Sequence, residues 1–174
     1  FADQLRRIFE DVLRGQLAAL ETEYGGKPVV LYEALLDMYE IDDEEFDEIL
    51  GGILTLNYDE FIEHAAEGLL SKSVDFGVTI RDRVPGSEAI QLLKLHGSFG
   101  WRDEWPIAET AATPPLWIPP GIRKAKDQYP FNLLWGLARE MLDCDVLRII
   151  GCQLGPNDWD LVSLLFSTRH VNSR

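Results

Sequence analysis

Three groups of polar residues each follow an apolar run directly, and these positions are where the sequence could do chemistry. The groups are Asn57 and Asp59 after residues 53–56, His96 and Ser98 after residues 89–95, and Gln153, Asn157 and Asp158 after residues 145–151. An imidazole has an unperturbed pKa of about 6.5, so His96 suits the role of a general base at neutral pH. The adjacent Gly97 lets another group approach closely. Simpler roles stay open. An Asn at a strand end often forms a turn, and the sole role of Asp59 could be to cap the next helix.

The apolar runs before these groups predict buried strands, and helical patterns separate the runs. Residues 60–70 predict a helix with His64 on its outer side, and residues 127–142 and 159–167 predict two more helices. Strands that alternate with helices favour a parallel sheet with right-handed crossovers. We therefore expect an α/β fold in which the three polar groups meet at the carboxyl edge of one sheet, where ligands bind.

The remaining segments predict short or irregular elements between the strands and a helical region at the N-terminal end. A short strand is expected at residues 78–80, an irregular loop at 99–113 and an extended segment at 116–118. Two helices, at residues 1–24 and 28–38, precede an acidic block at 42–48 that is typical of a solvated helix face. We expect a helical segment over residues 1–50, part of or inserted in the same domain, and a core over residues 51–174.

Composition excludes several classes of protein. The net charge is −14, with 30 acidic and 16 basic residues, which argues against nonspecific binding to nucleic acid. The two cysteines, Cys144 and Cys152, form no Cys-x-x-Cys pair, so a four-cysteine zinc site is excluded and two buried free thiols are expected. No apolar run has transmembrane length, and the charged residues 1–15 do not form a signal peptide. We expect a cytoplasmic protein without a bound metal.

Three stretches carry a recognisable pattern: Thr55-x-Asn57-x-Asp59, Lys94-Leu95-His96-Gly97-Ser98, and Ile149-Ile150-Gly151 followed by Asp158. Together they resemble the sirtuin-like (silent information regulator 2-like) family of NAD-binding domains. The resemblance runs from residue 52 to residue 166 and is closest to the bacterial branch often found in anti-phage defence. It implies a Rossmann-like parallel sheet, flanked by helices, that binds NAD across its carboxyl edge.

The family also implies a role for each matching residue. Asn57 is expected beside the nicotinamide ribose, Asp59 at the nicotinamide carboxamide, and His96 as the general base. The other expected NAD contacts are Thr55, Gly97, Ser98, Gly151 and Asp158, with the last two on the adenosine side. Cleavage of the nicotinamide–ribose bond passes through an oxocarbenium-like state, so the protein must supply a positioned base and exclude water.

The sequence departs from the family in two ways. No stretch matches the Gly-Ala-Gly-x-Ser motif whose backbone receives the pyrophosphate at a helix N-terminus. We expect either that this motif precedes Phe1 or that the site in this segment is incomplete. The zinc-binding cysteines of the protein deacetylases are also absent, which favours NAD hydrolysis over deacylation.

The resemblance therefore implies an NAD glycohydrolase that depletes NAD in anti-phage defence. Two alternatives stay open: an NAD-dependent protein deacylase, and a catalytically silent module for nucleotide binding or assembly. Because unregulated cleavage would drain cellular NAD, we expect control by homo-oligomerisation, by a partner ATPase of the HerA class or by a phage-derived trigger. No contact with a membrane or directly with nucleic acid is expected.

Overall fold

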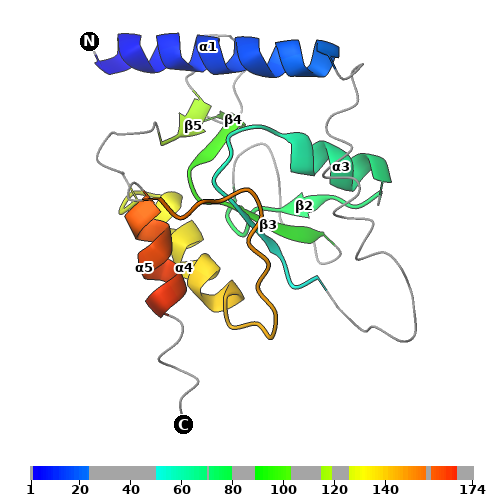
Figure 1. Ribbon diagram of the computed structural model, residues 1–174, viewed down its shortest axis with the longest axis vertical. Helices are drawn as coiled ribbons and strands as arrows, with labels where there is room; N and C mark the ends of the chain where they lie inside the picture. Colours follow the sequence, from blue (N-terminus) through cyan, green and yellow to red (C-terminus); the bar gives the residue numbers. More distant parts are fainter. Residues whose placement is uncertain are drawn as a thin grey trace.

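Figure 1 shows the computed structural model of the chain, which describes residues 2–23, 50–69, 71–79, 89–102, 115–118, 126–155 and 158–167. The helices are α1 (Ala2–Glu23), α3 (Phe61–Leu69), α4 (Phe131–Met141) and α5 (Trp159–Ser167). The strands are β1 (Ile53–Thr55), β2 (Val74–Asp75), β3 (Ile90–Lys94), β4 (Gly97–Arg102) and β5 (Pro115–Trp117).

The centre of the fold is a parallel sheet with the strand order β1-β3-β2. Ile53, Leu54 and Thr55 pair with Leu92, Leu93 and Lys94, and β2 pairs with the start of β3. The prediction of parallel strands at residues 53–56 and 89–95 is confirmed. With its flanking helices and N-terminal helix, the sheet has the predicted α/β, Rossmann-like architecture (Figure 1).

Strand β3 lies between the other two strands and forms the middle of the core. Leu92, Leu93, Lys94 and Leu95 are all fully buried. Side chains alternate between the two faces of a strand. Lys94 accordingly contacts α3, whereas Leu93 lies on the face covered by α4, close to Leu137. Both faces of β3 are therefore covered, as in central parallel strands, which is why Leu92, Leu93 and Leu95 are all buried.

The loop predicted at residues 99–113 is wrong over its described part, because β4 extends to Arg102. This strand pairs antiparallel with β5, and the extended segment predicted at 116–118 is confirmed as part of this pair. Phe99 and Trp101 are buried on alternate positions of β4. Aromatic side chains at period two favour a strand, so the signal was present, but the surrounding Gly and charged residues obscured it.

The third predicted strand, at residues 145–151, is also wrong. No other strand of the described chain pairs with it, and Val146 and Ile150 are each 57% exposed. An apolar run becomes a strand only where a neighbouring strand satisfies its backbone. The third strand of the sheet is instead β2, and residues 78 and 79 of the strand predicted at 78–80 are irregular.

The observed positions of the helices agree better with those predicted from the sequence. Helices α1, α3 and α5 lie where the apolar periodicity predicts them, and His64 is exposed as expected. Helix α4 begins later than predicted: Pro130 forms its N-cap, and a proline disfavours the helical conformation of the residue before it. The helix at 28–38 and the acidic block at 42–48 lie outside the described residues, and the division at residue 50 stays a prediction. None of the described helices is long and apolar enough to cross a membrane.

Candidate functional site

The carboxyl ends of β1 and β3 bring the two main polar groups together. Thr55 and Lys94 are partners in the parallel register, so Asn57 and His96 each lie two residues beyond the same pair. Asn57 is exposed and His96 is half-buried. The ring of Tyr58, next to Asn57, stacks on His96 with 6.3 Å between the ring centroids. The structure therefore places Asn57 and His96 just beyond the ends of adjacent parallel strands, at the edge where ligands enter such sheets.

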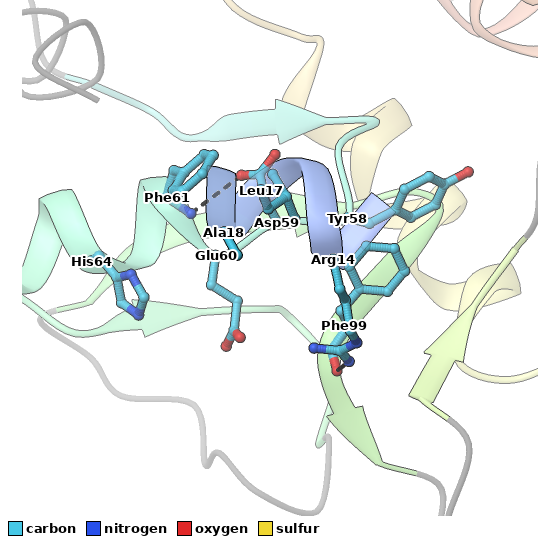
Figure 2. A pocket seen from close by; sticks show the side chains of 9 residues that line it. All are labelled: Arg14, Leu17, Ala18, Tyr58, Asp59, Glu60, Phe61, His64 and Phe99. Atoms are coloured by element: carbon cyan, nitrogen blue, oxygen red, sulfur yellow. Dashed lines mark hydrogen bonds between the residues drawn. The ribbon is translucent and has the colours of Figure 1, made fainter. Parts of the chain in front are cut away.

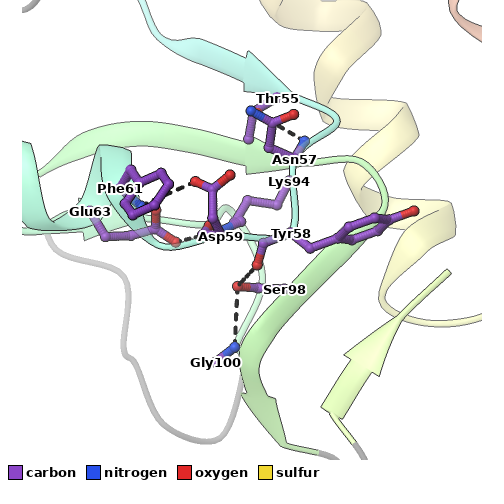
Figure 3. Close-up of polar contacts among 9 residues, drawn as sticks. All are labelled: Thr55, Asn57, Tyr58, Asp59, Phe61, Glu63, Lys94, Ser98 and Gly100. Carbon is purple, nitrogen blue, oxygen red and sulfur yellow. Dashed lines mark hydrogen bonds and ion pairs between the residues drawn. The ribbon is translucent and has the colours of Figure 1, made fainter. Parts of the chain in front are cut away.

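Residues 56–60 form a turn between β1 and α3, here called the β1–α3 turn, which its own side chains shape (Figure 3). The backbone N–H of Asn57 donates to Thr55 Oγ1 at 3.1 Å, and that of Phe61 donates to Asp59 Oδ1 at 3.2 Å. Asp59 therefore caps α3, which is the simpler of the two roles considered for it. Its second carboxylate oxygen remains available to a ligand in this geometry.

The stretch after β3 binds the carbonyl groups of the same turn. The N–H of Phe99 and the hydroxyl of Ser98 both donate to the Tyr58 carbonyl oxygen, at 3.0 and 3.1 Å. The N–H of Leu95 donates to the carbonyl of Thr55 at 3.0 Å. Ser98 is fully buried, so its position suits support of the turn more directly than contact with a ligand.

Gly97 is required by the close approach of β5. Its φ is 80°, and a Cβ there would lie on the carbonyl oxygen of Leu116 and 2.8 Å from Cα of Trp117. The N–H of Ile118 donates to the carbonyl of His96 at 2.8 Å. The group that approaches Gly97 in this structure is therefore the backbone of β5, which fixes the position of His96.

Tyr58 joins the turn to β5. Its hydroxyl donates to the carbonyl of Ile118 at 2.8 Å, and its ring packs edge-on against Trp117 with 5.0 Å between centroids. Burial raises the pKa of Tyr58 to about 12, so the phenol is neutral and remains a donor at physiological pH. These contacts make Tyr58 a structural centre between the turn and His96.

A buried ion pair supports the turn from below, and sequence reasoning missed it. The Lys94 ammonium lies 2.6 Å from Glu63 Oε1 and also donates to the backbone carbonyl of Asp59. Burial raises the pKa of Glu63, while the nearby Lys94 opposes that rise. The available signal was a lysine inside an apolar run, since a charged residue there requires a buried partner.

The third group of residues does not follow a strand of the sheet, because the segment between α4 and α5 contains no strand among its described residues. Gly151 is exposed with a φ of 66°, and Asp158 Oδ2 accepts a hydrogen bond from the N–H of Gly155 at 3.1 Å, just before α5. Both lie in the segment between α4 and α5, and their expected contacts with the adenosine side stay predictions.

Helix α1 covers the other side of the β1–α3 turn and leaves a shallow groove of about 190 Å³ (Figure 2). Arg14 donates from Nη2 to the carbonyl of Phe99 at 3.0 Å and lies over its ring. Phe9 stacks on Trp117 with 5.9 Å between centroids. The groove is lined by Arg14, Leu17, Ala18, Tyr58, Asp59, Glu60, Phe61, His64 and Phe99. Asp59 thus lies between the sheet edge and α1.

The chain has two cysteines, Cys144 and Cys152. Both cysteines are free thiols, but Cys144 is exposed and Cys152 half-buried, because residues 145–151 do not form a buried strand. The expectation that both thiols are buried is therefore wrong. Among the described residues, no three His, Cys, Asp or Glu side chains gather as metal ligands would.

Comparison with known proteins identifies the family. Residues 51–171 match the SIR2-like domain, which covers most of the chain and includes both strand ends described above. No curated protein and no solved structure matches the chain significantly. SIR2-like domains bind NAD and are generally NAD-dependent enzymes, so membership of this family implies an NAD-related function for the chain. The chain belongs to the SIR2-like domain family.

Proposed function

We propose that this chain is an NAD glycohydrolase that cleaves NAD to nicotinamide and ADP-ribose. One observation carries the proposal: Asn57 and His96 lie at the same level beyond two paired parallel strands, with the Tyr58 ring against the imidazole. An amide that can orient a water and an imidazole that can accept its proton are the groups that such a hydrolysis needs.

The residues present suit the nicotinamide-ribose half of NAD. Asn57 is exposed, and Thr55, Asp59 and His96 are half-buried, and all four lie at or just beyond the carboxyl ends of β1 and β3. The β1–α3 turn is fixed by its own hydrogen bonds, which reduces the ordering that binding would require. We assign Asp59 to the carboxamide, and Gly151 and Asp158 to the adenosine side.

In the proposed reaction the bond between ribose C1′ and the nicotinamide nitrogen breaks, and its electron pair leaves with nicotinamide. Water adds to C1′, and its proton passes to His96 and then to solvent. Asn57 places the water or the ribose hydroxyls. General-base assistance of this kind contributes about 10²–10⁴-fold to a rate, which is the loss expected when the imidazole is removed.

The test is incubation of the purified full-length protein with NAD, with and without an acylated peptide. Release of nicotinamide and ADP-ribose without peptide supports the proposal. Turnover that strictly requires the peptide would instead make the protein a deacylase, and no turnover under any condition would leave a silent binding module. The His96→Ala variant should lose cleavage while it keeps the circular dichroism spectrum of the wild type.

We further propose that this activity depletes NAD in anti-phage defence and is controlled by assembly. The expected partners are further copies of the chain, an ATPase of the HerA class or a phage-derived trigger. The motivation is chemical, since uncontrolled cleavage would drain the NAD of the cell. Light scattering of the purified protein tests the first of these partners, and a monomer at working concentration would count against homo-oligomeric control.

A further inference from the structure

Lys94 is the last residue of β3 and is fully buried, which is rare for a lysine. Its ammonium contacts two groups from the segment that carries the candidate site. One is Glu63 Oε1 on α3, at 2.6 Å, and the other is the backbone carbonyl of Asp59 in the β1–α3 turn. Figure 3 shows the side chain passing beneath the turn toward both partners.

Stability alone is a weak reason for such a pair. Removing two charges from water is costly, and apolar side chains of similar volume often give an equally or more stable core. Glu63 is only 2% exposed, so neither charge is solvated. A role beyond stability is therefore suggested by the third member of the contact, the Asp59 carbonyl.

That carbonyl belongs to the turn that carries Asn57. Two neighbouring carbonyl groups of this turn accept hydrogen bonds from the end of β3 and the start of β4: that of Asp59 from Lys94, and that of Tyr58 from Ser98. A hydrogen bond from an ammonium is about twice as strong as one between neutral groups. Lys94 also lies two residues before His96, so one short stretch fixes the turn and carries the imidazole.

We propose that Lys94 and Glu63 are a positioning pair that sets the β1–α3 turn, and with it Asn57, against His96. Lys94 binds the turn through the Asp59 carbonyl, and Glu63 Oε1 accepts a hydrogen bond from the ammonium and so directs it at that carbonyl. The inference deepens the proposed NAD-cleaving function and rests on it. It assigns neither residue a contact with the substrate.

A double-mutant cycle separates positioning from stability. Lys94→Met and Glu63→Met each leave one buried charge without its partner and should strongly lower the urea midpoint. The double variant removes both charges and should recover a midpoint close to the wild-type value. It should still cleave NAD at least tenfold more slowly, mainly through kcat, because the Asp59 carbonyl has lost its donor.

A second readout does not depend on NAD. The amides of Asn57, Phe61 and Phe99 form hydrogen bonds within or to the turn, so their hydrogen exchange reports its order. We expect exchange at least tenfold faster in the double variant than in the wild type. Glu63→Gln, which keeps an oxygen acceptor for Lys94, should retain most of the protection.

The Lys126–Asp160 pair is a matched control, with the same 2.6 Å separation but partly exposed side chains far from the turn in sequence. Lys126→Met should change neither turnover nor the exchange of the three amides.

A stable double variant with wild-type exchange and wild-type turnover would overturn the inference. If the double variant does not fold, Glu63→Gln decides: unprotected turn amides in an otherwise folded protein would refute it. A wild-type protein that does not cleave NAD would instead refute the proposed function, while the exchange rates would still test the pair.

Discussion

The Gly97→Ala substitution tests whether β5 fixes the position of His96. The glycine has a φ of 80°, a conformation that costs an L-residue about 1–2 kcal/mol. The added Cβ would lie 2.8 Å from Cα of Trp117, whereas carbon atoms make contact at about 3.5–4.0 Å. Strand β5 must therefore move by about 1 Å.

Such a movement stretches the hydrogen bond from the N–H of Ile118 to the carbonyl of His96, now 2.8 Å long. Loss of one buried backbone hydrogen bond costs about 1 kcal/mol. Together with the backbone strain, we expect a loss of about 3 kcal/mol in the free energy of unfolding. With an m-value of about 2 kcal/mol per molar urea, the midpoint should fall by about 1.5 M.

Gly151→Ala provides the control for backbone strain alone. Gly151 has a φ of 66°, but a Cβ there would meet nothing within 4 Å. This variant should lose only about 1–2 kcal/mol. The assay is urea unfolding followed by tryptophan fluorescence, with both variants measured beside the wild type. Equal losses for Gly97→Ala and Gly151→Ala would refute the steric reasoning, because the contact with β5 would then contribute nothing.

Three further predictions concern stability. Tyr58→Phe removes the donor to the Ile118 carbonyl and should cost about 1–2 kcal/mol in urea unfolding; a wild-type midpoint would show that this hydrogen bond contributes nothing. Burial raises the pKa of Glu63 above its ordinary value of 4.5, so between pH 4.5 and that raised pKa the folded protein retains a proton that the unfolded chain releases. The stability of the wild type relative to Glu63→Gln should therefore fall as the pH rises above 4.5, and a difference that grew with pH would contradict this sign. Gly136→Ala, at an exposed position inside α4 where a Cβ meets nothing within 4 Å, should raise the free energy of unfolding by about 0.5–1 kcal/mol, and a destabilised variant would argue against a regular helix there.

The sequence predicts the parts of the fold that carry a strong periodic signal. Residues 53–56 and 89–95 are apolar runs flanked by polar residues, and both form strands of the predicted parallel sheet. Helix α3 follows from its apolar spacing, and its cap follows from Asp59. The sequence was sufficient to predict that Asn57 and His96 lie at one edge of the sheet, because the carboxyl ends of parallel strands meet at the same edge.

Other parts depend on contacts that a linear pattern does not contain. Residues 145–151 are as apolar as β3, but no described strand pairs with them, and a strand requires a partner. The Lys94–Glu63 pair joins residues that are 31 positions apart, so only the packing of α3 on β3 reveals it. Gly97 suggested a close approach by some group, but only the structure shows that this group is β5.

The central claim is that the end of β1 places Asn57 at the reacting end of NAD. The most direct measurement compares nicotinamide release from NAD, without any peptide, by the wild type, Asn57→Ala and Asn132→Ala. Asn132 is an exposed asparagine on α4 and serves as the matched control. We predict wild-type release for Asn132→Ala and a loss of at least about 100-fold for Asn57→Ala, with the fold intact by circular dichroism. Equal release by all three proteins would contradict the claim.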